Sequence, residues 1–352
     1  MNSVLVIGGS GMLGSHIVTL LKEKLPNVKV NVLDLNQTQD VKGVTYYQGD
    51  ISIKAEVEHA VSSCKPDVIF HTASPGHGLK APLYKKVNVD GTNIVVAVAK
   101  AQGVKALVYT SSASIVCSGT DVVNANETIP YAQNLDAYSD TKAIAELAVL
   151  QANDFSGMQT CAIRPAGLLG EGDTQLIPGL LRVSAQGQAK YQLGDNSKIF
   201  DFTYVGNCAW AHILAAQKLI AERGMDLKAN EDVSRVGGEV FFITNGQPVY
   251  FWDFCRAVWA AAGVYERSIW RIPAALANLV GLISEVAAFF TGKEAAMTRY
   301  RVNFATMHRY FDIQKAEELL DYKPLVSLTE GIQRSVKWAQ ANTVSVADKK
   351  TQ

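Results

Sequence analysis

The sequence predicts an α/β protein with a doubly wound parallel sheet and a smaller C-terminal lobe, and three features support this fold class. Short runs rich in β-branched residues alternate with helical stretches through the first 170 residues. The first run leads directly into a glycine-rich turn, and the alternation weakens from about residue 171. Strands that alternate with helices favour a parallel sheet covered by helices on both faces.

The individual elements follow from this alternation. The expected strands lie at 4–8, 28–34, 67–72, 106–112 and 160–165. The stretches with a helical pattern between them are 11–24, 53–63, 89–100 and 140–152. Later in the chain we expect a helix at 176–188, a polar loop at 227–239, a strand at 239–244 and a helix at about 250–262.

These elements divide the chain into two unequal parts. Residues 1–170 form the predicted nucleotide-binding domain, with further contributions from about 200–220 and 240–248. Residues 171–345 are expected to build mainly a substrate-binding lobe. The polar residues 346–352 are expected to be a disordered tail.

Composition excludes several classes of protein. The chain has 33 basic and 33 acidic residues, so its formal charge of zero does not suggest a partner such as nucleic acid. The five cysteines are odd in number and form no C-x-x-C motif, which argues against a disulfide framework and fits a reducing compartment. No His, Cys and Asp cluster has the spacing of metal ligands, and we expect no metal.

The glycine-rich turn Gly8-Gly9-Ser10-Gly11-Met12-Leu13-Gly14 joins the first strand to the first helix. Glycine permits a tight turn and lets a phosphate approach the backbone, while the N–H groups at the start of the helix face the phosphate. Gly8, Gly11, Met12, Leu13 and Gly14 are therefore predicted to bind the pyrophosphate of a dinucleotide.

Two acids follow at the ends of later strands. Asp34 closes the second strand, where a carboxylate accepts hydrogen bonds from the adenosine ribose and repels a 2′-phosphate. No arginine stands in Leu35-Asn36-Gln37 to bind such a phosphate, so NAD is preferred over NADP. Asp50 and Ile51 are placed to contact the adenine, although each acid could also be an ordinary turn residue.

Three side chains are predicted to carry proton transfer. Ser112 follows the strand at 106–112, and Tyr138 and Lys142 lie four residues apart at the start of a helix, which stacks them on one face. A phenol has a pKa near 10 and needs a cation to act as a base at neutral pH. Ser112 would hydrogen-bond the substrate oxygen, Tyr138 would take the alcohol proton, and Lys142 would stabilise the phenolate.

Each of these features is commonplace by itself. A Y-x-x-x-K pair is usually an exposed pair of side chains without a function, and a serine at a strand end is common. The order of the features along one chain carries the prediction: glycine turn, acid, Ser-Ser, and then the tyrosine and lysine on the next helix.

Together these motifs resemble the extended short-chain dehydrogenase/reductases, a family with a Rossmann-type NAD-binding domain, and the resemblance runs nearly end to end. Residues 88–92 (NVDGT) match a pattern of that family, and 71–75 (HTASP) stands where the family has a turn beside the cofactor. The resemblance implies that Ala73 contacts the cofactor. It also selects Ser112, directly before an alanine, rather than Ser111.

The segment 164–167 (RPAG) matches the proline-containing loop that lies near the nicotinamide in this family, which implies a cofactor contact for Pro165. One departure is Ile7-Gly8-Gly9, where many relatives have Thr-Gly. This change leaves the turn intact.

Within the family, the chain resembles the 3β-hydroxysteroid dehydrogenase group and most of all the fungal sterol-4α-carboxylate 3-dehydrogenases (decarboxylating). The similar stretches are 71–78, 124–146, 164–180, 200–219 and 241–254. The resemblance implies NAD-dependent oxidation of the 3β-hydroxyl of a 4-carboxy sterol to a 3-keto acid that loses CO₂. It also implies peripheral association with the cytosolic side of the endoplasmic reticulum membrane, with a cytoplasmic location as the alternative, and a homodimer.

Two other functions remain open from the sequence. One is a dehydrogenase that tailors a sterol-like triterpenoid 4-carboxylate in secondary metabolism. The other belongs to a different class, a scaffold that senses NAD(H) without turnover. The complete set of Ser112, Tyr138 and Lys142 argues against the scaffold, because a sensor has no use for all three.

Residues 273–290 form an apolar stretch with one charge, Glu285. The alternatives are a buried helix or helix pair in the second lobe, a membrane-contacting helix through which a lipid enters, and a membrane span. The central Glu285 and Gly281 disfavour the span.

The sequence does not assign the groups that bind the substrate. Four basic residues are candidates for the carboxylate, although each could be a surface charge: Arg182, Lys190, Arg299 and Arg301. Five aromatic residues could line the pocket or belong to the core: Phe251, Trp252, Phe254, Trp259 and Trp270.

Overall fold

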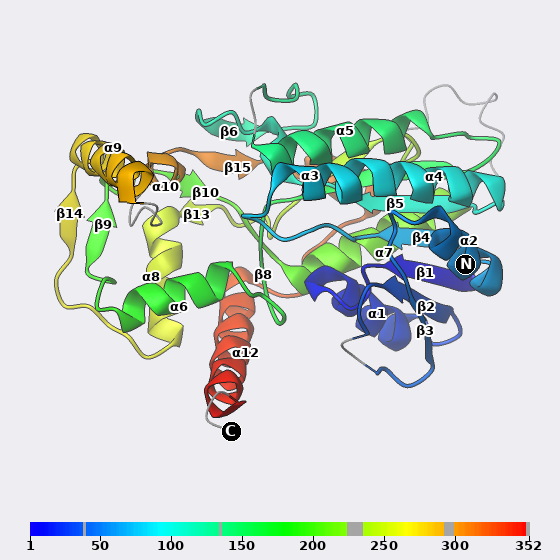
Figure 1. Cartoon of the computed structure of the whole chain (residues 1–352), viewed down its shortest axis with the longest axis horizontal. Coiled ribbons are helices and arrows are strands. Elements are labelled where there is room, and N and C mark those ends of the chain that lie inside the picture. Colours follow the sequence, from blue (N-terminus) through cyan, green and yellow to red (C-terminus); the bar gives the residue numbers. More distant parts are fainter. Residues whose placement is uncertain (38–39, 134–135, 224–234, 292–298, 350–352) are drawn as a thin grey trace.

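The structure is a computed structural model that describes residues 1–37, 40–133, 136–223, 235–291 and 299–349. A sheet with helices on both sides occupies one end of the molecule, and a second lobe occupies the other end (Figure 1). The loop predicted at 227–239 lies largely outside the described residues.

The central sheet consists of β1 (Ser3–Ile7), β2 (Lys29–Asp34), β3 (Val44–Gln48), β4 (Val68–His71), β5 (Ala106–Thr110), β7 (Gln159–Pro165) and β12 (Val240–Ile243). In the described part of the chain these seven strands are all parallel, in the order β12-β7-β5-β4-β1-β2-β3. The strand order reverses between β1 and β4, where doubly wound sheets bind their ligands. The predicted fold class is therefore confirmed.

The strands pack against helices on both faces. On one face lie α1 (Met12–Lys24), α7 (Val205–Glu222) and α11 (Gln314–Leu320), and on the other lie α2 (Lys54–Cys64), α4 (Thr92–Ala101) and α5 (Ala137–Gln151). Side chains of β1 alternate between the two cores: Val4 and Val6 face the first set of helices, and Leu5 and Ile7 face the second. This alternation is the period of two that a strand imposes.

The second lobe joins helices to short strands. Its helices are α6 (Leu176–Ala185), α8 (Phe251–Ala261), α9 (Ala274–Thr291), α10 (Arg299–Ala305) and α12 (Leu328–Lys349). A small sheet joins β13 (Val249–Tyr250), β10 (Ile199–Phe200), β15 (Arg309–Phe311) and β6 (Val122–Ala125) in that order, and two strand pairs join β11 (Phe202–Tyr204) to β8 (Gly167–Leu169) and β14 (Trp270–Ile272) to β9 (Tyr191–Leu193).

Three short helical segments complete the described chain: α3 (Ala81–Tyr84), the π-helical segment η1 (Lys85–Gly91) and the 3₁₀ turn η2 (Ala113–Val116). Segment η1 runs directly into α4, so the helix predicted from residue 89 begins earlier than expected.

Other sequence expectations need correction. Strand β3 was not predicted, because it lies at the edge of the sheet and its side chains are only partly covered. Helix α12 continues to Lys349 and so enters the segment predicted as a disordered tail, 346–352. Residues 350–352 lie outside the described residues.

The aromatic residues of the lobe serve mainly as its core. Phe254 and Trp259 are buried in the third hydrophobic cluster, and Phe251 and Trp252 pack against that cluster. Trp270 is 64% exposed. The interpretation as core residues therefore holds for Phe251, Trp252, Phe254 and Trp259. Trp270 is too exposed to belong to the core.

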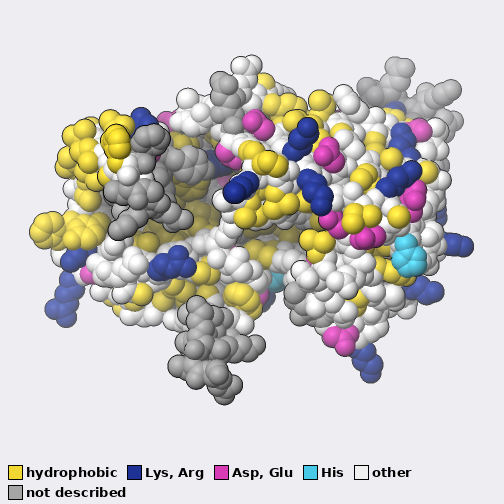
Figure 2. Space-filling view, in the orientation of Figure 1, with side chains coloured by type: hydrophobic (Ala, Val, Ile, Leu, Met, Phe, Trp, Pro, Cys, Tyr) yellow, Lys and Arg dark blue, Asp and Glu magenta, His cyan; other side chains and the backbone are white. Residues whose placement is uncertain are grey.

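The apolar stretch predicted at 273–290 forms a single helix, α9, that lies on the surface. Leu279 is 54% exposed, Ile283 60% and Phe290 80%. Figure 2 shows hydrophobic side chains gathered over this helix. A helix buried in the lobe is therefore wrong. Among the described residues, no helix combines the length and apolar character needed to cross a bilayer.

A buried ion pair connects α5 to the central sheet. Arg164 on β7 donates from Nε to Glu146 Oε2 at 2.9 Å and from its terminal nitrogen to Glu146 Oε1 at 2.6 Å. The two side chains are 3% and 0% exposed, and the Tyr131 hydroxyl donates a further hydrogen bond to Glu146 Oε1 at 2.8 Å. Removal of one of these two buried charges would leave the other without a partner, and an unpaired buried charge destabilises the fold.

Arg164→Met should therefore lower the free energy of unfolding by about 3–5 kcal/mol, because it leaves the buried Glu146 carboxylate without its partner. Urea denaturation followed by circular dichroism measures the change. Lys54→Met is the matched control, because it breaks an exposed pair with Glu58 (3.4 Å) and should cost less than about 1 kcal/mol. Equal losses in the two variants would contradict this account of the ion pair.

Candidate functional site

The predicted site residues meet at one edge of the central sheet. Gly8 directly follows β1, Asp34 ends β2, and Pro165 ends β7. Ala73 and Ser112 each come two residues after a strand, β4 and β5 respectively. Because the strands are parallel, their carboxyl ends lie along the same edge, so residues distant in the sequence are brought together.

The glycine turn forms a cradle that opens at the start of α1. Gly8 has φ = +80°, and a Cβ there would lie 2.7 Å from the backbone nitrogen of Ala73. A Cβ on Gly14 would lie 2.1 Å from the Gly8 carbonyl oxygen. At Gly11, by contrast, a Cβ would meet only the Gly8 carbonyl oxygen, at 3.3 Å.

Gly11 is the N-cap of α1 and supplies no side-chain acceptor. The N–H groups of the first turn, at Met12 and Leu13, are thus available to an anion, and the positive end of the helix dipole adds to the attraction. The pyrophosphate of a dinucleotide fits this cradle.

Asp34 lies beside the turn. Its Oδ2 accepts a hydrogen bond from the Ser10 backbone N–H at 2.9 Å, and its Oδ1 accepts one from the Asn36 N–H at 3.4 Å, so the carboxylate is held next to the cradle. Asp50 accepts hydrogen bonds from Ser52 and pairs with Lys86 at 3.1 Å. Ile51 is buried at 6% exposure, so its own side chain belongs to the core.

A chain of hydroxyl groups connects Ser112 to the first turn of α5, which carries Tyr138. The Ser112 and Ser114 hydroxyls are 2.9 Å apart, and the Ser139 hydroxyl donates to Ser114 Oγ at 2.9 Å. Asp136 is the N-cap of α5 and accepts hydrogen bonds from the N–H groups of Tyr138 and Ser139, so the tyrosine lies in the first turn of the helix.

Lys142 is buried one turn further along α5. Its amine donates to the Thr110 carbonyl oxygen and lies 4.4 Å from the centroid of the Tyr109 ring. Burial lowers the pKa of Lys142 to about 7, although the Glu146 carboxylate opposes the shift. Burial likewise raises the pKa of Tyr138 to about 12, and the nearby Ser112 hydroxyl opposes this shift. Each charge is therefore unfavourable alone, and a phenolate and an ammonium brought close together would offset each other's cost.

Two aromatic side chains that sequence reasoning did not single out enclose the Tyr138 ring. The His77 ring centroid is 4.0 Å from that of Tyr138, and the Tyr84 ring centroid is 5.7 Å away. The Tyr84 hydroxyl donates to the Gly76 carbonyl oxygen at 2.7 Å and so fixes the loop that carries His77. In the sequence, the stretch 71–78 that contains His77 is distinguished only by its resemblance to relatives.

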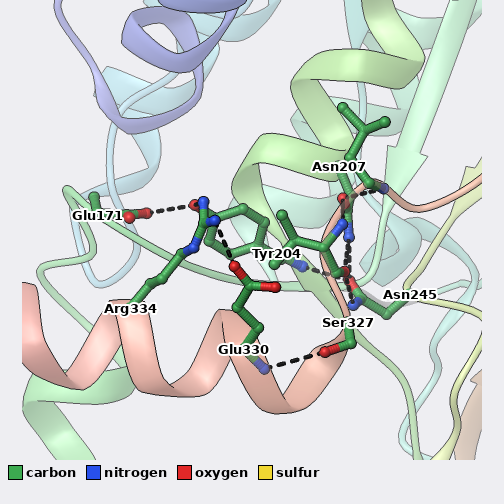
Figure 3. A network of polar contacts seen from close by, with 9 residues as sticks. Glu171, Tyr204, Asn207, Asn245, Ser327, Glu330 and Arg334 are labelled. Carbon is green, nitrogen blue, oxygen red and sulfur yellow. Dashed lines mark hydrogen bonds and ion pairs between the residues drawn. The ribbon is translucent and has the colours of Figure 1, made fainter.

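A polar network connects the C-terminal helix to the cofactor edge (Figure 3). The Tyr204 hydroxyl donates to Glu171 Oε2 at 2.8 Å, and Arg334 on α12 lies 3.5 Å from the same hydroxyl. A Cβ on the next residue, Gly172, would lie 3.3 Å from the Met12 Cα. The loop that carries Glu171 thus packs on the first turn of α1, a contact that no local sequence pattern indicates.

A cavity lies elsewhere, in the second lobe at the base of α9. It measures ≈ 620 Å³, and its lining includes Lys198, Arg271 and Thr306. None of the predicted site residues lines it. The strand ends and α5 therefore indicate where the candidate site lies, and this cavity does not.

Comparison with known proteins agrees with this geometry. The chain is 44% identical over 349 residues to the sterol-4-alpha-carboxylate 3-dehydrogenase, decarboxylating, of Candida albicans, which covers 96% of this chain and 97% of the relative. It is 42% identical to the enzyme of the same name from Saccharomyces cerevisiae, with the same coverage. The human sterol-4-alpha-carboxylate 3-dehydrogenase, decarboxylating, is 34% identical over 94% of this chain and 87% of its own.

Solved structures share the fold at lower identity. The Bordetella bronchiseptica enzyme WbmH in complex with NAD⁺ has a TM-score of 0.72 and 18% identity over 97% of this chain and 99% of that one. The Thermus thermophilus UDP-glucose 4-epimerase complex with NAD has a TM-score of 0.70 and 21% identity, over 96% and 99%. Residues 5–274 match the model of one family. The chain belongs to the 3-beta hydroxysteroid dehydrogenase/isomerase family.

Proposed function

We propose that this protein is an NAD-dependent enzyme that oxidises the 3β-hydroxyl of a 4-carboxy sterol to a 3-keto acid, which then loses CO₂. The observation that carries the proposal is the placement of Tyr138 and the buried Lys142 one turn apart on α5. The Ser139 and Ser114 hydroxyls connect the start of this helix to Ser112, at the sheet edge that holds the glycine cradle. The near full-length similarity to decarboxylating sterol-4-alpha-carboxylate 3-dehydrogenases supports the choice of substrate.

The residues divide the work of the oxidation. Ser112 hydrogen-bonds the substrate oxygen, and Tyr138 as phenolate takes the hydroxyl proton while the C3 hydride leaves. NAD⁺, when bound, supplies the hydride acceptor. The positive charge of Lys142 lowers the cost of forming the phenolate, which burial of the ring otherwise makes high.

The loss of CO₂ follows from the product of oxidation. A carbonyl at C3 beside a C4 carboxylic acid is a β-keto acid, and the carboxyl proton moves to the carbonyl oxygen as the C4–carboxyl bond breaks. CO₂ and an enol result, and the enol becomes the 3-ketone. The protein therefore has to provide only the oxidation.

Incubation with NAD⁺ and a panel of 4-carboxy sterols and 4-carboxy triterpenoids tests this function. We expect NADH and CO₂ to form in equal amounts, measured by absorbance and by release of a labelled carboxyl carbon. NADH without CO₂ would refute the decarboxylating reaction.

Tyr138→Phe should lower turnover by roughly 10²- to 10⁴-fold and leave NAD binding nearly unchanged, and retained activity would overturn the role of the tyrosine.

We also propose that Asp34 determines the preference for NAD. Asp34→Ala combined with Leu35→Arg should weaken NAD binding roughly tenfold and improve binding of NADP, because a ribose acceptor is removed and a phosphate-binding cation is added. Fluorescence titration with NADH and NADPH measures both affinities. Asp40→Ala, which removes a nearby exposed carboxylate, is the control; an unchanged ratio in the double variant would contradict the ribose contact.

A third part of the proposal concerns membranes. Helix α9 exposes Leu279, Ile283 and Phe290, and the strand before it exposes Trp270, an aromatic residue of the kind that lies at lipid interfaces. The one acid of the helix, Glu285, pairs with Arg299 at 2.8 Å. We infer peripheral binding of α9 to a lipid surface, on the cytosolic side of the endoplasmic reticulum membrane, where an apolar substrate would be available.

Co-sedimentation with vesicles of phosphatidylcholine and phosphatidylserine tests this contact. Leu279→Glu with Ile283→Glu should weaken vesicle binding by at least about tenfold, because each leucine-sized side chain contributes roughly 1.5–3 kcal/mol when buried. Val123→Glu with Leu325→Glu adds the same charge at two exposed apolar positions elsewhere and should bind like the unchanged protein. If both pairs bind equally well, α9 is not the contact.

The homodimer stays a prediction. Exposed apolar residues one turn apart on α5, Ile144 (53%) and Leu147 (45%), offer a surface for a second copy.

A further inference from the structure

The proposed reaction needs a charged amine on Lys142, and burial opposes that charge. The side chain is 2% exposed and lies one turn after Tyr138 on α5. Burial lowers the pKa of Lys142 to about 7, so a modest interaction decides whether the amine is charged at neutral pH. The groups that contact this amine therefore matter more than those around an exposed lysine.

Two consecutive residues of β5 contact the Lys142 amine. It donates a hydrogen bond to the Thr110 carbonyl oxygen, and it lies over the Tyr109 ring, 4.4 Å from the ring centroid. A cation in this position is attracted by the negative face of the ring, and more strongly where water is excluded. Tyr109 is 1% exposed. Because a neutral amine lacks this attraction, the ring favours the charged form of the lysine.

Carboxylates do little to compensate the charge of Lys142. Within the described ranges no ion pair joins its amine to an acid. Glu146, one turn further along α5, favours the ammonium, but both oxygens of its carboxylate accept hydrogen bonds from Arg164 of β7. The charges of that pair have opposite signs, so they largely cancel at the lysine.

Two buried histidines lie on neighbouring elements, and both are neutral at neutral pH. The His71 ring of β4 is 5.3 Å from the Tyr109 ring between centroids, and burial lowers the pKa of His71 to about 3. His212 of α7 lies with Nε2 2.7 Å from the Thr110 hydroxyl, and burial lowers its pKa to about 4. Its Nδ1 is 2.8 Å from the Cys208 carbonyl oxygen and so carries the proton, which leaves Nε2 to accept from Thr110.

On the other elements that pack against α5, the titratable groups contact Tyr138 or face solvent. The ring centroids of His77 and Tyr84 are 4.0 Å and 5.7 Å from that of Tyr138. Asp136 accepts hydrogen bonds from the N–H groups of the first turn of the helix. The charged residues of η1 and α4 are exposed: Lys85, Lys86, Asp90 and Lys100. The ring and the carbonyl of β5 are therefore the main support for the ammonium.

We propose that Tyr109 is a positioning residue, whose ring face holds the Lys142 amine in place and keeps it charged at neutral pH. The inference rests on the proposed function, because it assigns the group that maintains the cation of that reaction. The ring is the part of Tyr109 that acts, since its buried hydroxyl makes no hydrogen bond in the described part of the chain.

Tyr109→Phe and fluorinated phenylalanines at the same position test the assignment. Fluorine withdraws electron density from the ring face and changes the shape of the ring little, so it weakens the attraction stepwise. NMR titration of protein labelled at lysine Cε gives the pKa of Lys142, whose signal is the one lost in Lys142→Met. We expect Tyr109→Phe to titrate like the unchanged protein, and the most fluorinated ring to lower the pKa by roughly one unit.

The same fluorinated residues at Phe70 are the matched control. Phe70 is as buried as Tyr109 and lies on the neighbouring strand β4, but it packs on the opposite face of the sheet. Fluorination there should leave the titration of Lys142 unchanged. Equal shifts from the two positions, or no shift along the series at position 109, would overturn the assignment.

Turnover provides a second measurement. Tyr109→Leu removes the ring and should lower oxidation of a 4-carboxy sterol roughly five- to tenfold between about pH 7 and pH 8, because less of the lysine is charged, and Tyr109→Phe should keep the activity. Loss of activity in Tyr109→Leu without any shift in the fluorinated series would show that the side chain only fills space, and the assignment would be wrong. The titration needs no substrate: a shift in a protein that oxidises no 4-carboxy sterol would support the contact and refute the proposed function.

Discussion

The parallel arrangement of the central sheet is the constraint on which the site depends. In such a sheet every strand ends at the same edge, so each connection there must turn sharply before the next helix begins. Gly8, Asp34, Ala73, Ser112 and Pro165 all lie at or just after those ends. The proposed cofactor cradle and the proposed proton-transfer residue Ser112 therefore lie along one edge because of strand direction, although more than 150 residues separate Gly8 from Pro165.

Helix α5 depends on the same sheet for its position. Asp136 starts the helix beside Ser112, and the buried pair of Glu146 and Arg164 attaches it to β7. Tyr138, Lys142 and Glu146 follow each other at intervals of four residues, so they line one face of the helix. A single helix face thus holds the proposed base, its cation and the anchor to the sheet.

The sequence was sufficient to predict the parts of the molecule that follow from local sequence patterns. The strand ends, the glycine turn and the order of Ser112, Tyr138 and Lys142 all follow from spacing along the chain. The structure was needed for His77 and Tyr84, which reach the Tyr138 ring from a loop and from the short helix α3 without any local signature. Strand β3 was missed for a related reason: at the edge of the sheet its side chains are only half covered, so its hydrophobic pattern is weak.

The packing of α7 on α1 has a consequence for how the protein is made. Ile17 and Leu21 of α1 are covered by residues of α7, such as Ala211 and Ala215, and β12 closes the edge of the sheet at β7. When residue 170 leaves the ribosome, the nucleotide-binding half therefore still has an open apolar face and an unpaired strand. Such surfaces invite aggregation. The apolar face of α1 is covered only once α7 has been made, and β7 gains its second neighbour only with β12, which ends at residue 243.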